Sequence, residues 1–119
     1  MYEPTVIMKP VVNEFGLSER DMNTIYGIFK QFPEVQEVLI FGSRAMGNYK
    51  FGSDIDLAIM NVVEPQTVRT ISGYFSESSL PYFVDLVNVR HLTNPEFIDH
   101  IKRNGILFFS QKPIVNPQI

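Results

Sequence analysis

Segment 53–59, Ser-Asp-Ile-Asp-Leu-Ala-Ile, constrains the fold more than any other part of the chain. Asp54 and Asp56 alternate there with aliphatic residues, and a period of two indicates a β-strand with one polar and one apolar face. The apolar face has to pack against a core. The two carboxylates then leave the opposite face together, with Cα atoms about 6.5–7 Å apart. The chain must therefore form a sheet that lies between a hydrophobic core and a polar site.

Length and composition indicate one folded domain over residues 1–119. At 119 residues the chain has no room for a second core, and 45% hydrophobic with 19% charged residues is typical of globular proteins. The formal charge of −3 argues against unspecific binding to a phosphate backbone, so we do not expect nucleic acid as a partner. The sequence has no cysteine, no signal-peptide pattern and no apolar run near the roughly 20 residues of a membrane helix. These features predict a cytoplasmic protein without a membrane segment.

Hydrophobic periodicity and capping residues predict alternating helices and strands. Ser18 and Asp21 form an N-cap signature, and Asn94-Pro95 forms another. We expect an α+β, or mixed α/β, fold: a small mixed sheet with helices packed on one face. The N-terminal segment 1–16 and the tail 111–119 contain prolines and are expected to be irregular. The expected elements are a helix over about Glu19–Phe32, a strand over Val35–Phe41, a short helix after Ser43, a strand over Ile55–Ile59, a short helix from Pro65 ending before the Ser76–Ser79 loop, a central strand over Tyr82–Val87, a helix from Pro95 closed by Gly105, and a strand over Ile106–Phe109.

Gly42-Ser43 follows a predicted strand and is a candidate phosphate-binding turn. Glycine lets the backbone turn and approach a ligand closely, and serine is placed to cap a short helix from Arg44 to about Asn48. A helix start binds phosphate through its free N–H groups and the positive end of its dipole. Taken alone, a Gly-Ser pair after a strand is more often only a turn.

Asp54 and Asp56 are candidate metal ligands. Two carboxylates this close repel each other unless a cation lies between them, and hard oxygen donors favour magnesium. A solvated strand face is the simpler interpretation of an isolated Asp-x-Asp pair. Two features argue for a site: ten residues separate Ser43 from Asp54, enough to bring the two strands side by side, and Asp85 can add a third carboxylate from a neighbouring strand.

The amino-acid sequence of segments 42–47 and 53–59 closely resembles that of the minimal nucleotidyltransferases of the DNA polymerase β-like superfamily. Their hallmark is Gly-Ser, ten residues, then Asp-x-Asp. The resemblance extends to Val84–Asn88 as the third-carboxylate strand, and it is greatest with the small MNT antitoxins of HEPN/MNT toxin–antitoxin pairs. It implies a nucleotidyltransferase fold, with ATP or another nucleoside triphosphate as donor and a small helical HEPN-type partner whose tyrosine receives AMP.

Carried over by position, the resemblance assigns roles to six residues. Gly42 and Ser43 would hold the triphosphate, and Arg44, at a position that the small members often fill with arginine, is a further candidate phosphate ligand. Asp54 and Asp56 would bind magnesium, and these two with Asp85 form the implied catalytic and metal-binding set, suited to two metal ions. The sequence identifies neither the base of the nucleotide nor the acceptor.

Two other functions stay open at this stage. The domain could bind nucleotide and regulate a partner without turnover, or it could transfer a nucleotide to a small molecule such as an aminoglycoside. Several other residues are interpreted as structural or surface residues and assigned no role in the site: Lys50, Tyr74, Phe75, Tyr82, Phe83, His91 and His100.

Overall fold

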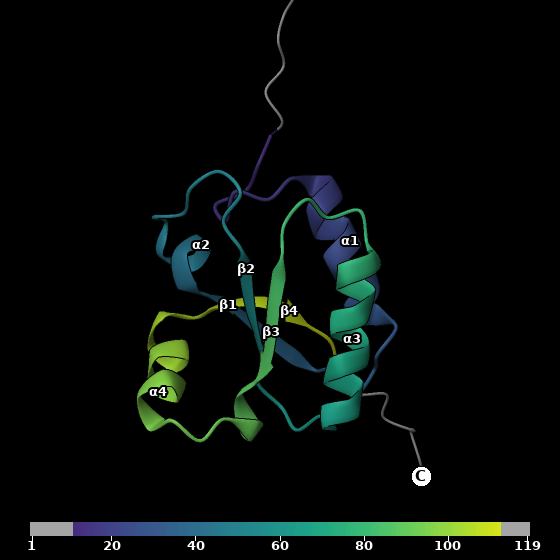
Figure 1. Ribbon diagram of the computed structural model, residues 1–119, viewed down its shortest axis with the longest axis vertical. Helices are drawn as coiled ribbons and strands as arrows, with labels where there is room; N and C mark the ends of the chain where they lie inside the picture. Colours follow the sequence, from purple (N-terminus) through teal and green to yellow (C-terminus); the bar gives the residue numbers. More distant parts are fainter. Residues whose placement is uncertain (1–10, 113–119) are drawn as a thin grey trace, which may run out of the picture.

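The computed structural model describes residues 11–112. Helices and strands follow one another in the order that the sequence predicts (Figure 1). A 3-10 turn, η1, is added between the third strand and the last helix. In chain order the elements are α1 (Glu19–Lys30), β1 (Glu37–Phe41), α2 (Gly42–Met46), β2 (Ile55–Ile59), α3 (Pro65–Glu77), β3 (Val84–Asn88), η1 (Val89–His91), α4 (Pro95–Asn104) and β4 (Ile106–Ser110).

The four strands form one mixed sheet in the order β3-β2-β1-β4. Strand β1 is antiparallel to β2 and to β4, whereas β2 and β3 are parallel. A parallel pair needs a crossover connection, which α3 supplies between β2 and β3. The predicted mixed sheet is confirmed. The prediction that the third strand is central is wrong, because β3 is an edge strand whose apolar side is covered by α3.

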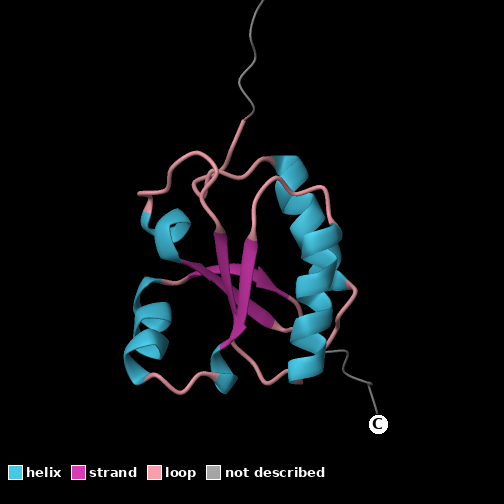
Figure 2. Cartoon of the chain, viewed as in Figure 1, coloured by secondary structure: helices cyan, strands magenta, loops and turns pink. Residues whose placement is uncertain are grey.

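Helices cover both faces of this sheet. Helices α1 and α3 lie together on one face, whereas α2 and α4 lie on the other (Figures 1 and 2), so the prediction that helices pack on one face only is wrong. The second face attracts a helix because part of it is apolar: Phe41 of β1 and Ala58 of β2 pack against Ile101 and Phe97 of α4. The end of this face near α2 is left to polar side chains.

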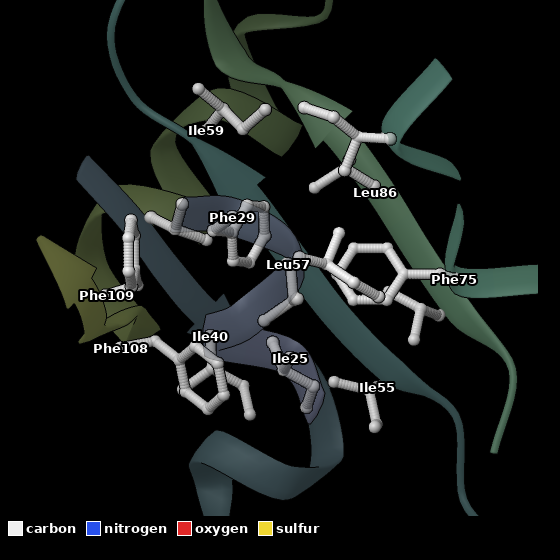
Figure 3. Packing of buried hydrophobic residues seen from close by; sticks show 14 of the residues in the cluster. Ile25, Phe29, Ile40, Ile55, Leu57, Ile59, Phe75, Leu86, Phe108 and Phe109 are labelled. Carbon is white, nitrogen blue, oxygen red and sulfur yellow. The ribbon is translucent and has the colours of Figure 1, made fainter. Parts of the chain in front are cut away.

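The main core lies between the sheet and the α1/α3 layer (Figure 3). Phe29 of α1 stacks on Phe109 of β4 at 5.2 Å between ring centroids and meets Phe75 of α3 edge-on at 5.4 Å. Ile55 and Leu57 of β2 are fully buried in the same core. Full burial of such side chains contributes about 1.5–3 kcal/mol each, so the apolar face of β2 holds the strand rigidly in place.

Local signals account for most helix ends. Ser18 and Asp21 form a reciprocal capping box, and Asn94 caps α4 with its side chain. Helix α3 continues through Ser76 and Glu77 and is longer than expected, because Phe75 anchors its last turn in the core. The last turns of both α1 and α4 carry basic residues, as the helix dipole favours.

Residues 11–18 form no helix or strand, but the end of this segment is anchored. Phe15 and Leu17 are buried, and Val12 forms an isolated antiparallel bridge with Ser18. The expectations for residues 1–10 and 113–119 lie outside the described part of the chain. Between residues 11 and 112, no helix combines the length and the apolar character that crossing a membrane would require.

Two glycines test the helix assignments. An alanine side chain at exposed Gly73, inside α3, would meet no atom within 4 Å, so Gly73→Ala should raise the free energy of unfolding by about 0.5–1 kcal/mol. At Gly105, the C-cap of α4, the added atom would collide with the Ile101 carbonyl and the Leu39 side chain. Gly105→Ala should therefore destabilise by about 1–3 kcal/mol. Urea unfolding measures both, and equal effects would contradict the assignments.

Candidate active site

Strand pairing brings the three predicted carboxylates to one face of the sheet. In the parallel register of β2 and β3, Asp56 lies directly beside Asp85. Asp54 precedes Asp56 by two residues and leaves the chain on the same side. Asp56 is half-buried, whereas Asp54 and Asp85 are exposed. The cluster therefore has one sheltered member and two that solvent or a ligand can reach.

The charges of Asp54 and Asp85 act on the carboxyl group of Asp56. Burial raises the pKa of the Asp56 carboxyl above its usual value, and the negative charges of Asp85 and Asp54 raise this pKa further. The nearby Arg44 opposes these effects weakly. A carboxylate with a raised pKa is one whose charge the folded chain itself does not compensate.

Gly42 touches this cluster directly. A Cβ atom at position 42 would collide with the Asp56 carboxyl oxygen, and the backbone φ of +73° is one that only glycine adopts readily. Register explains the contact, because Phe41, the last residue of β1, pairs with Asp56. The predicted phosphate-binding turn and the predicted metal ligands are therefore adjoining surfaces.

Helix α2 starts earlier than expected. It spans Gly42–Met46 instead of starting after Ser43, because the extended backbone of Phe41 ends the strand and Gly42 already turns into the helix. Ser43 therefore lies in the first turn and is not the N-cap. The N-cap residue, Phe41, offers no side-chain acceptor, so within residues 11–112 no side-chain cap binds the first-turn N–H groups. A helix start of this kind can donate to an anion.

Arg44 follows this helix start and is buried. Its side chain is 2% exposed, and its guanidinium donates to the main-chain carbonyls of Phe15 and Ser53. The rings of Tyr49 and Tyr82 lie against it. The sequence predicted a phosphate ligand at this position. In the structure, the hydrogen bonds of Arg44 go to the protein's own backbone.

The donor set of the cluster suits magnesium. Its members are hard carboxylate oxygens, and within residues 11–112 the only ion pair, at 3.2 Å, joins Arg103 to Asp99 on α4. No described cation is therefore paired with the three aspartates. As these side chains stand, the described residues form no group of three acidic or histidine side chains arranged to hold a metal ion. A metal ion therefore requires the three carboxyl groups to move closer together than they lie in this structure.

Most of the residues to which the sequence analysis assigned no role in the site lie outside the carboxylate cluster. His91 and Lys50 are exposed, and Phe75 belongs to the main core. Tyr82 stacks on Arg44, so it is structural, as interpreted, but its contact lies close to the site. The Tyr49 ring also lies against Arg44, and the Ser53 carbonyl accepts its hydrogen bonds; the sequence analysis missed both contacts. Nothing in the spacing of these loop residues marks them as partners of Arg44.

The charge cluster predicts a pH-dependent gain in stability. Asp56→Asn removes a carboxylate whose raised pKa disfavours the folded state at neutral pH. The metal-free variant should be more stable than the parent at pH 7 by up to about 1 kcal/mol, the upper range for partly exposed charges. The gain should disappear as the pH falls below the usual carboxyl value of 3.8, where both states are protonated. Thermal unfolding across pH measures it; a loss of stability at pH 7 would contradict the account.

Comparison with known proteins identifies the fold independently. The family model described as polymerase beta, nucleotidyltransferase matches residues 23–114. A toxin–antitoxin complex with AMP-PNP is similar to this chain at TM-score 0.62 and 22% identity, covering 77% of this chain and 75% of that one. The toxin–antitoxin MntA-HepT matches at TM-score 0.55 and 20% identity, over 76% of this chain and 70% of that one.

A third solved structure contains a tri-AMPylated HEPN toxin of Shewanella oneidensis with its MNT antitoxin. It matches at TM-score 0.55 and 20% identity, covering 76% of this chain and 70% of that chain. A search of curated proteins finds no match. At these identities the structural likeness shows the fold, while the family model spans most of the sequence, including both halves of the candidate site. The chain therefore belongs to the polymerase beta nucleotidyltransferase family.

Proposed function

We propose that this protein transfers AMP from ATP to a hydroxyl group of a partner protein, as the antitoxin of a HEPN/MNT pair. One observation carries the proposal: the Gly42 backbone lies against the Asp56 carboxyl group, and Asp85 is the strand neighbour of Asp56. A triphosphate held at the turn would then lie within reach of all three carboxylates. Nucleotidyl transfer is the chemistry that needs both components in one place.

Gly42 and Ser43 would bind the triphosphate through backbone N–H groups at the uncapped start of α2. The lack of a side chain at Gly42 lets a phosphate approach as closely as the Asp56 carboxyl does. Asp54 and Asp56 would hold Mg²⁺ beside the phosphates, and Asp85 would complete the site on the acceptor side. We place Arg44 outside this set of ligands because its hydrogen bonds are made to carbonyls.

Magnesium bound to these carboxylates would neutralise the phosphate charge and polarise the α-phosphoryl group. The acceptor oxygen would form a bond to the α-phosphorus as the bond to pyrophosphate breaks in line. The acceptor proton would pass to the Asp85 carboxylate or to water. Most of the catalysis would come from positioning and charge compensation, because the protein forms no covalent bond in this reaction.

The exposure of the site supports a macromolecular acceptor. Asp54 and Asp85 are open to solvent. Asp85 belongs to the edge strand β3, and Asp54 lies just before β2, the strand next to it. A hydroxyl carried by another protein can therefore approach without entering a deep cavity. The toxin–antitoxin complexes of similar fold, one with an AMPylated HEPN toxin, make a HEPN protein the first partner to test.

Transfer of labelled AMP tests the proposal. The protein, ATP labelled at the α-phosphate, Mg²⁺ and a HEPN protein encoded beside it should yield labelled partner protein. Asp85→Asn should reduce the rate at least 100-fold, in the range expected when a group that stabilises the transition state is removed. Asp99→Asn is the matched control, because Asp99 is an exposed aspartate in a surface ion pair on α4, and it should keep the parent rate.

Two results would contradict the proposal in different ways. If ATP binds but label never reaches the partner, the protein is a nucleotide-binding regulator without turnover. If label reaches an aminoglycoside and not the partner protein, the acceptor is a small molecule. Equal rates for Asp85→Asn and Asp99→Asn would remove the carboxylate cluster from the reaction.

A further inference from the structure

The guanidinium of Arg44 ties together segments that are far apart in sequence. Its Nε and Nη2 atoms donate to the Ser53 carbonyl at 3.1 and 2.7 Å, and Nη1 donates to the Phe15 carbonyl at 2.9 Å. A longer contact from Nη1 reaches the Gly16 carbonyl at 3.4 Å. One side chain of α2 therefore holds both the loop that leads into β2 and the segment that precedes α1.

Two tyrosine rings enclose this cation. The Arg44 Cζ atom lies 4.4 Å from the centre of the Tyr82 ring and 5.3 Å from that of Tyr49. Tyr49 also lies against Gly16, where a Cβ atom would collide with the ring and where φ is +73°. Cation–π contacts and charge-assisted hydrogen bonds together stabilise a cation that is 2% exposed.

The hydrogen bonds between Arg44 and Ser53 join two residues that lie next to the two halves of the candidate site, the Gly42-Ser43 turn and the aspartate pair. Arg44 follows Ser43 of the predicted phosphate-binding turn, and Ser53 precedes Asp54 of the carboxylate pair. The two residues joined by the Arg44–Ser53 hydrogen bonds are therefore immediate sequence neighbours of residues that would bind ligand. A planar guanidinium fork fixes both distance and direction, which a lysine ammonium cannot reproduce.

We propose that Arg44 is a positioning residue that sets the spacing between the Gly42-Ser43 turn and Asp54, braced by the Phe15–Gly16 segment. For turnover the inference rests on the proposed function; for geometry it rests on the contacts alone. Positioning matters because a displacement of about 1 Å can cost a factor of about 100 in rate. Arg44 thus acts on the reaction through other groups and not as a ligand of the nucleotide.

Hydrogen–deuterium exchange tests the geometric part without any ligand. Gly16→Ala changes no predicted site residue, but its side chain would collide with the Tyr49 ring and strain the backbone at φ +73°, which should shift the Phe15 and Gly16 carbonyls that Arg44 binds. We expect faster exchange in segments 42–46 and 53–55 of Gly16→Ala and of Arg44→Lys, with the β1 and β4 amides unchanged. Gly27→Ala is the control, because its added atom meets nothing within 4 Å and should leave both segments as they are.

Kinetics with the partner protein test the effect on the reaction. Arg44→Ala should lower kcat about 10- to 100-fold with a smaller change in KM for ATP, and millimolar guanidinium should restore part of kcat. Ile71→Val lies in the core on the other side of the sheet and serves as a control. It should lower the melting temperature and leave the contacts of Arg44 unchanged. It should keep the parent kcat at temperatures where it is folded.

Each outcome decides a separate point. A raised KM for ATP with unchanged kcat would make Arg44 a direct phosphate ligand and overturn the positioning role. Exchange that stays unchanged in segments 42–46 and 53–55, or rises uniformly across the sheet, would overturn it as well. If the parent protein transfers no label at all, the proposed function fails, while the exchange experiment still tests whether Arg44 sets the spacing.

Discussion

The antiparallel pairing of β1 with β2 is the constraint on which the rest of the site depends. It places Phe41 opposite Asp56, so Gly42, the next residue, turns directly over that carboxyl group. A slip of one residue would exchange the two faces of β2 and send both aspartates toward the core. Burial of Ile55 and Leu57 on the other face prevents such a slip. The register that forms the core is therefore also the register that forms the site.

Stability and function are assigned to opposite faces of one strand. Ile55 and Leu57 on one face of β2 supply packing energy, while Asp54 and Asp56 on the other face, beyond buried Ala58, collect like charges that the folded chain leaves without a paired cation among residues 11–112. Burial of Arg44 among carbonyls and rings adds a second rigid element beside the carboxylates. An active site that works mainly by positioning needs this division, since its ligands must stay fixed while they repel one another.

The sequence predicted features that depend on near neighbours along the chain. The Ser18 cap, the alternation around Asp56 and the order of helices and strands are confirmed, because capping and periodicity are local. The edge position of β3 was missed, since an apolar run does not reveal the sheet order. The burial of Arg44 was missed because its partners are main-chain carbonyls and rings that only the tertiary structure brings together. The position of Asp85 beside Asp56 is found in the register of β2 and β3, and a joint role of the two carboxylates in one site stays a prediction.

Backbone amide NMR with Mg²⁺ and a non-hydrolysable ATP analogue tests the central claim most directly, because it reports both halves of the site in one experiment. If the turn and the carboxylates form one site, the Gly42 and Ser43 amides should shift together with those of Asp54, Asp56 and Asp85. These shifts should follow a single binding curve that requires the metal ion. Shifts confined to one half, separate binding curves for the turn and the carboxylates, or binding centred elsewhere on the sheet would contradict the claim.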